Sequence, residues 1–325
     1  MAGQRVLVSG MGGELGSQVT SLLEDEPWVG QLMGVDLDPP RRRLRRAEFH
    51  RIMPGERSKA VELITRFDPH VVVHVAVWEP NARAGARDAA DLTRRAAQAV
   101  LGAAAECPSL EAVVVRSGIE IYGRGRGSLT RPDESTPPSP TSPYGRSVAG
   151  VEQVADSLRP LGITVGAVRL ASVVGPHVPS PLGRLLRLPA VPFSVVADPA
   201  FCVVEGSCAA RALVAAARVR LDEPVNVVAP GSITTRQALQ RGRRLPIPLL
   251  GPEWLAARAL SHVVGAPVPE HLLELMHRGR LADGRRAHDV LGVSPRLSTA
   301  QVIDELYRWP SVVRQAPRVA WEVAS

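Results

Sequence analysis

The chain has 325 residues, of which 45% are hydrophobic, so it can bury a sizeable core as one large domain or two closely associated ones. Its longest apolar runs, such as VVVHVAVW at residues 71–78, are too short to cross a bilayer, which argues against a membrane-spanning protein. The formal net charge is +7, and the three cysteines lie apart without a CxxC pair, so neither a disulfide framework nor a metal site is expected.

The first elements are a strand at residues 5–10 (RVLVSG) and a helix at residues 13–26. The N-terminal sequence enters this strand pattern directly and has no signal-peptide features, so a cytoplasmic location is expected. Between strand and helix, Gly10, Gly13 and Gly16 form a G-x-x-G-x-x-G pattern. In such a pattern the glycines permit a tight turn, close approach of the backbone to a pyrophosphate, and close packing of the helix on the strand.

The helix that follows the glycine turn begins at about Glu14 and Leu15, and its free N–H groups would face the phosphates. The turn therefore predicts dinucleotide binding, with a purely structural turn as the alternative. A second strand, residues 31–36, ends at Asp36, 20 residues after Gly16, where a carboxylate can accept both ribose hydroxyls. The same carboxylate would repel a 2′-phosphate, which favours NAD over NADP.

An arginine cluster, RRRLRR at residues 41–46, comes next. The first arginines of this cluster lie close to Asp36 in the sequence, so NADP remains an alternative, less favoured cofactor. The cluster could also meet nucleic acid. Aromatic residues are only 4% of the chain, however, and none interleaves the arginines as in proteins that bind single strands. We therefore expect a solvated loop and no nucleic-acid partner.

Strand and helix patterns then alternate through the first half of the chain. Helices are predicted at residues 56–67, 89–106 and from 142 onward, and strands at residues 70–77, 111–117 and 162–170. Continuous β-branched runs between helices indicate a parallel sheet covered on both faces. The expected fold is α/β, a Rossmann-like doubly wound parallel sheet. His74 lies in one of these apolar strands and is expected to be a hydrogen-bonded core residue.

After residue 172 the pattern becomes less regular and richer in proline. We predict a Rossmann domain at residues 1–172 and a smaller, mostly helical substrate lobe at residues 173–325. A helix at residues 206–219 and a strand near residues 224–228 are expected to return to the main sheet, so that the lobe is interleaved with it. The tail beyond Trp309 gives weak signals.

Five segments together resemble the extended short-chain dehydrogenase/reductase family, in the NAD-dependent epimerase/dehydratase group that includes nucleotide-sugar epimerases. The segments are VVHVAV (72–77), RSGIEIYG (116–123), SPYGRSVAGVE (142–152), VRLASVVGP (168–176) and DGRRAHDVLGVSP (283–295). The resemblance implies a nicotinamide cofactor, which would contact Ala76, Val77, Ser117, Leu170 and Ala171. It also implies that Tyr144 exchanges a proton with the substrate, and that two copies pair through helices of the sheet domain.

The family pattern breaks where the chemistry should be. The lysine one turn after the tyrosine is replaced by Val148, and the serine or threonine before the Y-G tyrosine is replaced by Gly118. An unassisted tyrosine has a pKa of about 10 and is almost wholly protonated at neutral pH. The aspartate that usually faces the adenine is aligned with Met53, and the arginine that grips a substrate diphosphate is aligned with Ala200.

Two functions follow from these departures. The first is an NAD(P)-binding protein with an atypical site and weak or non-standard catalysis. The alternative is an active epimerase, dehydratase or reductase that uses Tyr144 on a nucleotide-sugar-like or other small polar substrate. The sequence names no substrate.

Overall fold

A seven-stranded parallel sheet forms the centre of the structure. The computed structural model describes residues 3–81, 84–195, 197–249 and 268–309. In the sheet the strands follow the order β11-β6-β5-β4-β1-β2-β3. They are β1 (Gln4–Ser9), β2 (Val29–Asp36), β3 (Glu48–Arg51), β4 (Val71–His74), β5 (Ala112–Gly118), β6 (Thr164–Leu170) and β11 (Pro224–Val227). This arrangement confirms the predicted α/β fold.

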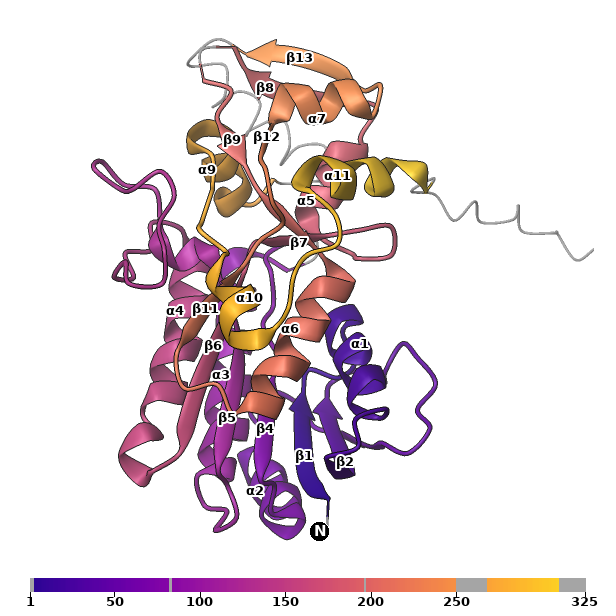
Figure 1. Ribbon diagram of the computed structural model, residues 1–325, viewed down its shortest axis with the longest axis vertical. Coiled ribbons are helices and arrows are strands. Elements are labelled where there is room, and N and C mark those ends of the chain that lie inside the picture. The colour runs from indigo at the N-terminus through magenta and orange to yellow at the C-terminus, as the bar shows by residue number, and fades with distance from the viewer. Residues whose placement is uncertain (1–2, 82–83, 196, 250–267, 310–325) are drawn as a thin grey trace, which may run out of the picture.

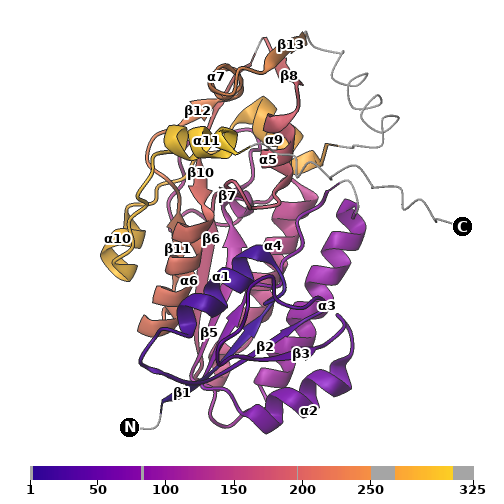
Figure 2. The ribbon, with the colours of Figure 1, turned by 90° about the vertical axis from the view of Figure 1, so that its right-hand side faces the viewer.

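Helices cover both faces of the sheet, as Figure 2 shows. Helices α2 (Arg57–Phe67), α3 (Ala86–Ala104) and α4 (Pro143–Asp156) pack side by side on one face. Helices α1 (Glu14–Leu23) and α6 (Gly206–Val219) pack together on the other. Because both faces are covered, the central strands are apolar throughout; the three valines of β4 have no exposed surface.

Most predicted elements are present, and the differences are at the edges. Strand β11 pairs with β6, so the chain does return to the main sheet after α6, as predicted. The sequence did not predict β3, a four-residue edge strand (EFHR) whose side chains are exposed or half-buried. The strand predicted at residues 70–77 ends at His74, and the next residues form the edge of a cavity.

The smaller lobe stands above the carboxyl ends of the main strands (Figure 1). It contains more strand than predicted: β7 (Ser172–Val174) pairs with β10 (Val203–Glu205), β9 (Ala200–Phe201) with β12 (Ile233–Thr234), and β8 (Ala190–Ser194) with β13 (Leu245–Leu249). Four of these strands have only two or three residues, too few for an alternating pattern, and prolines interrupt β8 and β13. The lobe helices are α5 (Pro181–Arg187), α7 (Thr235–Arg241), α9 (Glu270–Arg278) and α11 (Thr299–Arg308), while α10 (Arg286–Leu291) packs on α6. Residues 250–267 and 310–325 of the predicted lobe lie outside the described residues.

A buried ion pair ties α4 to the sheet. Arg169 of β6 donates two hydrogen bonds to the Glu152 carboxylate, at 2.9 and 2.8 Å. A third goes to the hydroxyl of Tyr122 in the 3-10 helix η1 (Ile119–Tyr122), and that hydroxyl donates to Asn226 of β11. Burial opposes the charge of Arg169, but its bonds and attraction to Glu152 raise its pKa above the ordinary value. The positive charge of Arg169 inside the fold is therefore compensated by one carboxylate, that of Glu152.

His74 is fully buried, and neither of its ring nitrogens has a hydrogen-bond partner among the described residues. The expectation of a hydrogen-bonded histidine is therefore wrong. Burial lowers the pKa of His74 to about 4. The unfolded chain takes up this proton near pH 6.5, so the neutral buried ring contributes stability above that pH and loses it as the pH falls toward 4.

We predict that His74→Leu removes this pH dependence. Between pH 7 and pH 4 the wild-type protein should lose about 3 kcal/mol more unfolding free energy than the variant, because each pKa unit corresponds to about 1.4 kcal/mol. Urea unfolding at a series of pH values measures both proteins. Other titrating groups are common to both, so identical pH slopes would contradict the assignment.

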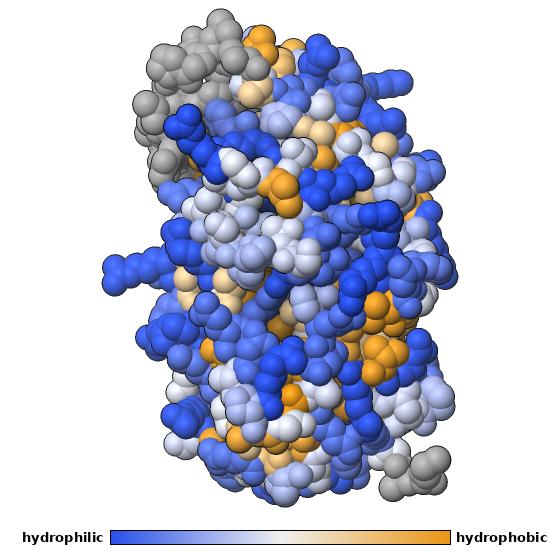
Figure 3. Space-filling view, turned by 60° about the vertical axis from the view of Figure 1, so that its left-hand side comes forward, coloured by the Kyte–Doolittle hydropathy of each residue, from blue (hydrophilic) through white to orange (hydrophobic). Residues whose placement is uncertain are grey.

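The surface gives two further observations. Among the described residues, no helix combines the length and the apolar character needed to cross a bilayer. In the view of Figure 3, apolar side chains form small separate groups among polar ones.

Candidate functional site

The turn between β1 and α1 has the geometry that close approach to a ligand requires. Gly10 has a φ of +87°, and a Cβ at this residue would lie 2.6 Å from the backbone nitrogen of Ala76. A Cβ at Gly16 would lie 1.9 Å from the carbonyl oxygen of Gly10, so glycine is needed for α1 to start this close to the strand. The first N–H groups of α1 have no acceptor within the helix and form its positive end. The turn can therefore hold an anion such as a pyrophosphate.

A cavity of about 270 Å³ opens beside this turn. Eight of the residues predicted to bind the cofactor line it: Gly10, Gly13, Glu14, Leu15, Gly16, Asp36, Ala76 and Val77. Ser117, Leu170 and Ala171 are buried and are not part of its wall. The structure thus brings together the predicted phosphate and adenosine-side contacts and leaves the predicted nicotinamide contacts outside this cavity.

Asp36 ends β2 beside the glycine turn. Its Oδ2 accepts a hydrogen bond of 2.7 Å from the backbone N–H of Gly12, and its Oδ1 accepts one of 2.5 Å from Leu37. Burial raises the pKa of Asp36, although these backbone bonds oppose the shift. Met53, aligned with the adenine position, lines a small neighbouring cavity together with Asp36 and Ser9.

The arginine cluster at 41–46 is largely bonded within the protein. Arg42 pairs with Glu14 at 3.2 Å, and Arg46 donates to three backbone carbonyls between the end of α1 and the start of β2. Arg41 is the member that lines the cavity beside the glycine turn. One arginine of the cluster therefore faces the cavity, on the side where Asp36 lies.

Tyr144 lies in the first turn of α4 but is covered by the smaller lobe. Tyr144 is 6% exposed. The ring of His271 from α9 lies against the Tyr144 ring, and the two ring centroids are 4.8 Å apart. The Nε2 of His271 is 3.0 Å from Oε1 of Glu79, which follows β4. The Tyr144 hydroxyl makes no hydrogen bond to the residues that the structure describes.

Four charges act on the phenol of Tyr144. Burial raises its pKa above the ordinary value, and the positive charge of Arg116 opposes this shift. The carboxylates of Glu79 and Glu120 raise the pKa further, and Arg280 lowers it. The combined effect of burial and the two carboxylates is larger than that of the two arginines, so the pKa of Tyr144 is raised and the phenol stays protonated at neutral pH.

The place of the missing serine or threonine is occupied by a carboxylate. A Cβ at Gly118 would lie 2.4 Å from Oε2 of Glu120. Oε1 of Glu120 accepts a hydrogen bond of 3.0 Å from Arg280, whose guanidinium also pairs with Glu274 of α9 at 2.6 Å. Glu274 in turn accepts a hydrogen bond from the Thr141 hydroxyl. An internal charge network therefore fills the space beside Gly118.

No cation replaces the missing lysine or the missing diphosphate arginine at their own positions. Val148 is completely buried in the main core. Ala200 has an arginine as its backbone neighbour, because the N–H of Arg280 donates to its carbonyl at 3.1 Å. The side chain of Arg280 is 2% exposed and is neutralised by two carboxylates, so it is not free to bind a diphosphate.

The residues that surround Tyr144 in the fold but lie far from it in the chain were not predicted from the sequence. His271, Glu274 and Arg280 belong to a segment that showed only an amphipathic helical pattern, and nothing local pairs them with Glu79. Arg116 was visible as the first residue of RSGIEIYG, but only as part of a strand. An arginine in an otherwise apolar strand is the signal that could have identified it.

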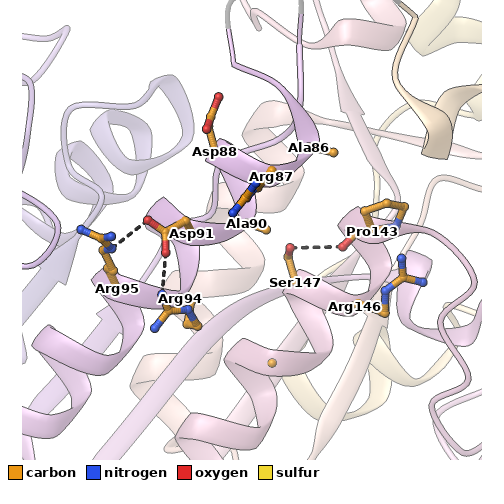
Figure 4. Close-up of a pocket in the computed structure, with 11 residues that line it drawn as sticks. Ala86, Arg87, Asp88, Ala90, Asp91, Arg94, Arg95, Pro143, Arg146 and Ser147 are labelled. Carbon is orange, nitrogen blue, oxygen red and sulfur yellow. Dashed lines mark hydrogen bonds and ion pairs between the residues drawn. The ribbon is translucent and has the colours of Figure 1, made fainter.

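A larger cavity, of about 760 Å³, lies between α3 and α4 and shares no lining residue with the one at the glycine turn (Figure 4). Its wall is charged, and Asp91 pairs there with Arg94 at 2.5 Å and Arg95 at 2.7 Å. The pairing of two copies through helices of the sheet domain stays a prediction. No group of three or more potential metal ligands occurs among the described residues.

Solved structures share this fold. MoeE5 in complex with UDP-glucose and NAD matches at 20% identity and a TM-score of 0.70, over 94% of this chain and 98% of its own. UDP-glucose 4-epimerase from Thermotoga maritima, with UDP-glucose, matches at 18% identity and a TM-score of 0.70, over 94% of this chain and 98% of its own. A dTDP-glucose 4,6-dehydratase from Bacillus anthracis, in complex with NAD, matches at 15% identity and a TM-score of 0.71, over 94% and 96%.

In sequence, the chain is 28% identical to an uncharacterised protein of Mycobacterium tuberculosis, over 93% of this chain and 83% of that protein. The sequence model of the NAD dependent epimerase/dehydratase family matches residues 6–188, more than half of the chain. With its glycine turn, its parallel sheet and this match, the chain belongs to the NAD-dependent epimerase/dehydratase family.

Proposed function

We propose that this chain is an NAD-binding member of its family whose catalysis on nucleotide sugars is weak or non-standard. One contrast carries the proposal: the cavity at the glycine turn is open and lined by eight of the residues predicted to bind the cofactor, while Tyr144 is covered by His271 and lacks its lysine. The NAD named in the complexes of MoeE5 and the B. anthracis dehydratase supports the choice of cofactor.

The residues at the cavity fit a dinucleotide. The N-terminus of α1 offers backbone N–H groups to a pyrophosphate, and the Asp36 carboxylate offers oxygens to ribose hydroxyls. Bound NAD would supply a nicotinamide that accepts hydride. The protein's part is to position the dinucleotide and to hold a proton on the Tyr144 hydroxyl, which the raised pKa ensures.

We predict that the protein binds NAD at least tenfold more tightly than NADP, because the negative charge of Asp36 repels a 2′-phosphate. Calorimetry with both oxidised cofactors measures this preference. Asp36→Asn should reduce the preference while Arg41 remains to attract the phosphate. Equal affinities for NAD and NADP in the wild-type protein would contradict the role of Asp36.

Catalysis is tested separately, by following absorbance and product with NAD and a set of nucleotide sugars. We expect little or no turnover by the wild-type protein. Turnover that Tyr144→Phe abolishes would instead establish the alternative, an active epimerase, dehydratase or reductase. The presence of Arg116 near the phenol is the observation that favours this alternative.

A further inference from the structure

The structure assigns to Arg116 the role of the cation that the α4 helix lacks: we propose that it binds the ribose–phosphate portion of the dinucleotide that faces Tyr144. This positioning role rests on the proposed binding of NAD. It does not require that the protein turn over any substrate.

The first argument is where the strands place the residue. Arg116 lies near the carboxyl end of β5, and the order β5-β4-β1-β2 puts it two strands from the glycine turn and three from Asp36. Strands lie about 4.8 Å apart, so these separations are about 10 Å and about 14 Å. A dinucleotide held by its pyrophosphate at the turn and by one ribose at Asp36 extends in the direction of β5.

The second argument is that its guanidinium is available. Arg116 is half-buried and lines the cavity together with the glycine turn, Ala76 and Glu79. Its side chain makes one hydrogen bond within the described residues, from Nη1 to the carbonyl of Val77 at 3.3 Å, and pairs with no described carboxylate. A guanidinium has five N–H donors, so most of them remain for a ligand.

The third argument is the contrast between Arg116 and two arginines that are buried. Arg169 and Arg280 each lie within ion-pair distance of at least one buried carboxylate, so their charge is already compensated. Arg116 differs in facing a cavity rather than an acidic partner. Its planar fork suits phosphate and ribose oxygens, which it can bind through two parallel bonds.

The charge of Arg116 also reaches the phenol. It is the largest influence that lowers the pKa of Tyr144, against the greater effect of burial. One residue on β5 thus combines two tasks that the family assigns to a lysine on the helix: holding the cofactor and placing a positive charge near the tyrosine. On this proposal the role falls to a strand of the sheet instead of the α4 helix.

The test compares ligands that end at different points along the cavity. Calorimetry with ADP, ADP-ribose and NAD is performed on the wild-type protein and on Arg116→Gln, Arg116→Lys and Arg146→Gln. We expect Arg116→Gln to weaken NAD and ADP-ribose about 10- to 100-fold, the range for a lost charge-assisted hydrogen bond. ADP, which ends at the pyrophosphate, should change less than about twofold. Arg116→Lys should recover only part of the lost affinity, because an ammonium keeps the positive charge but cannot form the two parallel bonds of a guanidinium.

Arg146→Gln is the matched control, because this exposed arginine also lies close to Tyr144 in the sequence but is outside the cavity. It should bind all three ligands like the wild-type protein. Equal losses for ADP and NAD in Arg116→Gln would overturn the assignment, since they would place the defect at the glycine turn. Unchanged affinities would overturn it too. A wild-type protein that binds none of the three ligands would instead refute NAD binding itself.

Discussion

Glu152→Gln is expected to lower the free energy of unfolding by about 3–5 kcal/mol, the cost of removing one partner from a buried ion pair. The substitution keeps the shape of the side chain and removes its charge. Arg169 is 4% exposed and pairs with no second carboxylate among the described residues, since its third bond goes to the Tyr122 hydroxyl. A guanidinium left in this position keeps its desolvation cost without its compensating charge.

Urea unfolding followed by circular dichroism measures the loss, and Glu111→Gln is the matched control. Glu111 pairs with Arg220 on the surface, where the two side chains are 45% and 43% exposed. Water and salt screen that pair, so its loss should cost less than about 1 kcal/mol. A Glu152→Gln variant no less stable than Glu111→Gln would show that the buried pair does not hold α4 on the sheet.

The parallel sheet could be predicted because its strands carry their burial in their own sequence. Runs such as the three valines of β4 are apolar on both faces and alternate with helical patterns, which occurs when helices cover both sides. Strand β11 was found in the same way, although α6 and the first part of the lobe separate it from β6 in the chain. In both strands, valine-rich runs beside helical patterns were enough to predict the element.

The edges and the small sheets of the lobe could not be predicted in this way. Strand β3 has no buried residue, and β9 and β12 have two residues each, so their pairing depends on partners far away in the sequence. A pattern of period two needs more residues than these strands contain. Their existence follows from tertiary contacts rather than from local preference.

The same distinction, between local patterns and distant tertiary contacts, applies to the candidate site. The glycine turn and Asp36 were predicted because their spacing is local and each residue has a geometric reason to be there. The surroundings of Tyr144 were not, since Glu79 and His271 are 192 residues apart in the chain and meet only when α9 packs over α4. The sequence showed which groups were missing from the surroundings of Tyr144, and the structure showed which charged groups act on it.

Gly16→Ala is expected to reduce NAD affinity at least 100-fold and also to destabilise the protein. The added Cβ would lie 1.9 Å from the Gly10 carbonyl oxygen and 3.0 Å from the Cα of Met11, and both are backbone atoms that cannot rotate away. The helix must therefore shift away from β1. Its first N–H groups would then leave the positions in which they hold a pyrophosphate. The loss of two hydrogen bonds to a charged group, at about 1.5–3 kcal/mol each, corresponds to a factor of about 100 or more in affinity. Calorimetry with NAD and urea unfolding measure the two effects.

Two other glycines separate binding from folding in this prediction. A Cβ at Gly13 has one neighbour, 3.6 Å away, so Gly13→Ala should fold normally yet bind NAD weakly, because its methyl group enters the space of the phosphates. A Cβ at Gly102 in α3 meets nothing within 4 Å, so Gly102→Ala should bind NAD normally and gain about 0.5–1 kcal/mol of stability. If Gly13→Ala bound NAD as tightly as Gly102→Ala does, the turn would be a packing device between β1 and α1. The phosphates would then have to be held elsewhere, because a methyl group and a phosphate oxygen cannot occupy the same space above the turn.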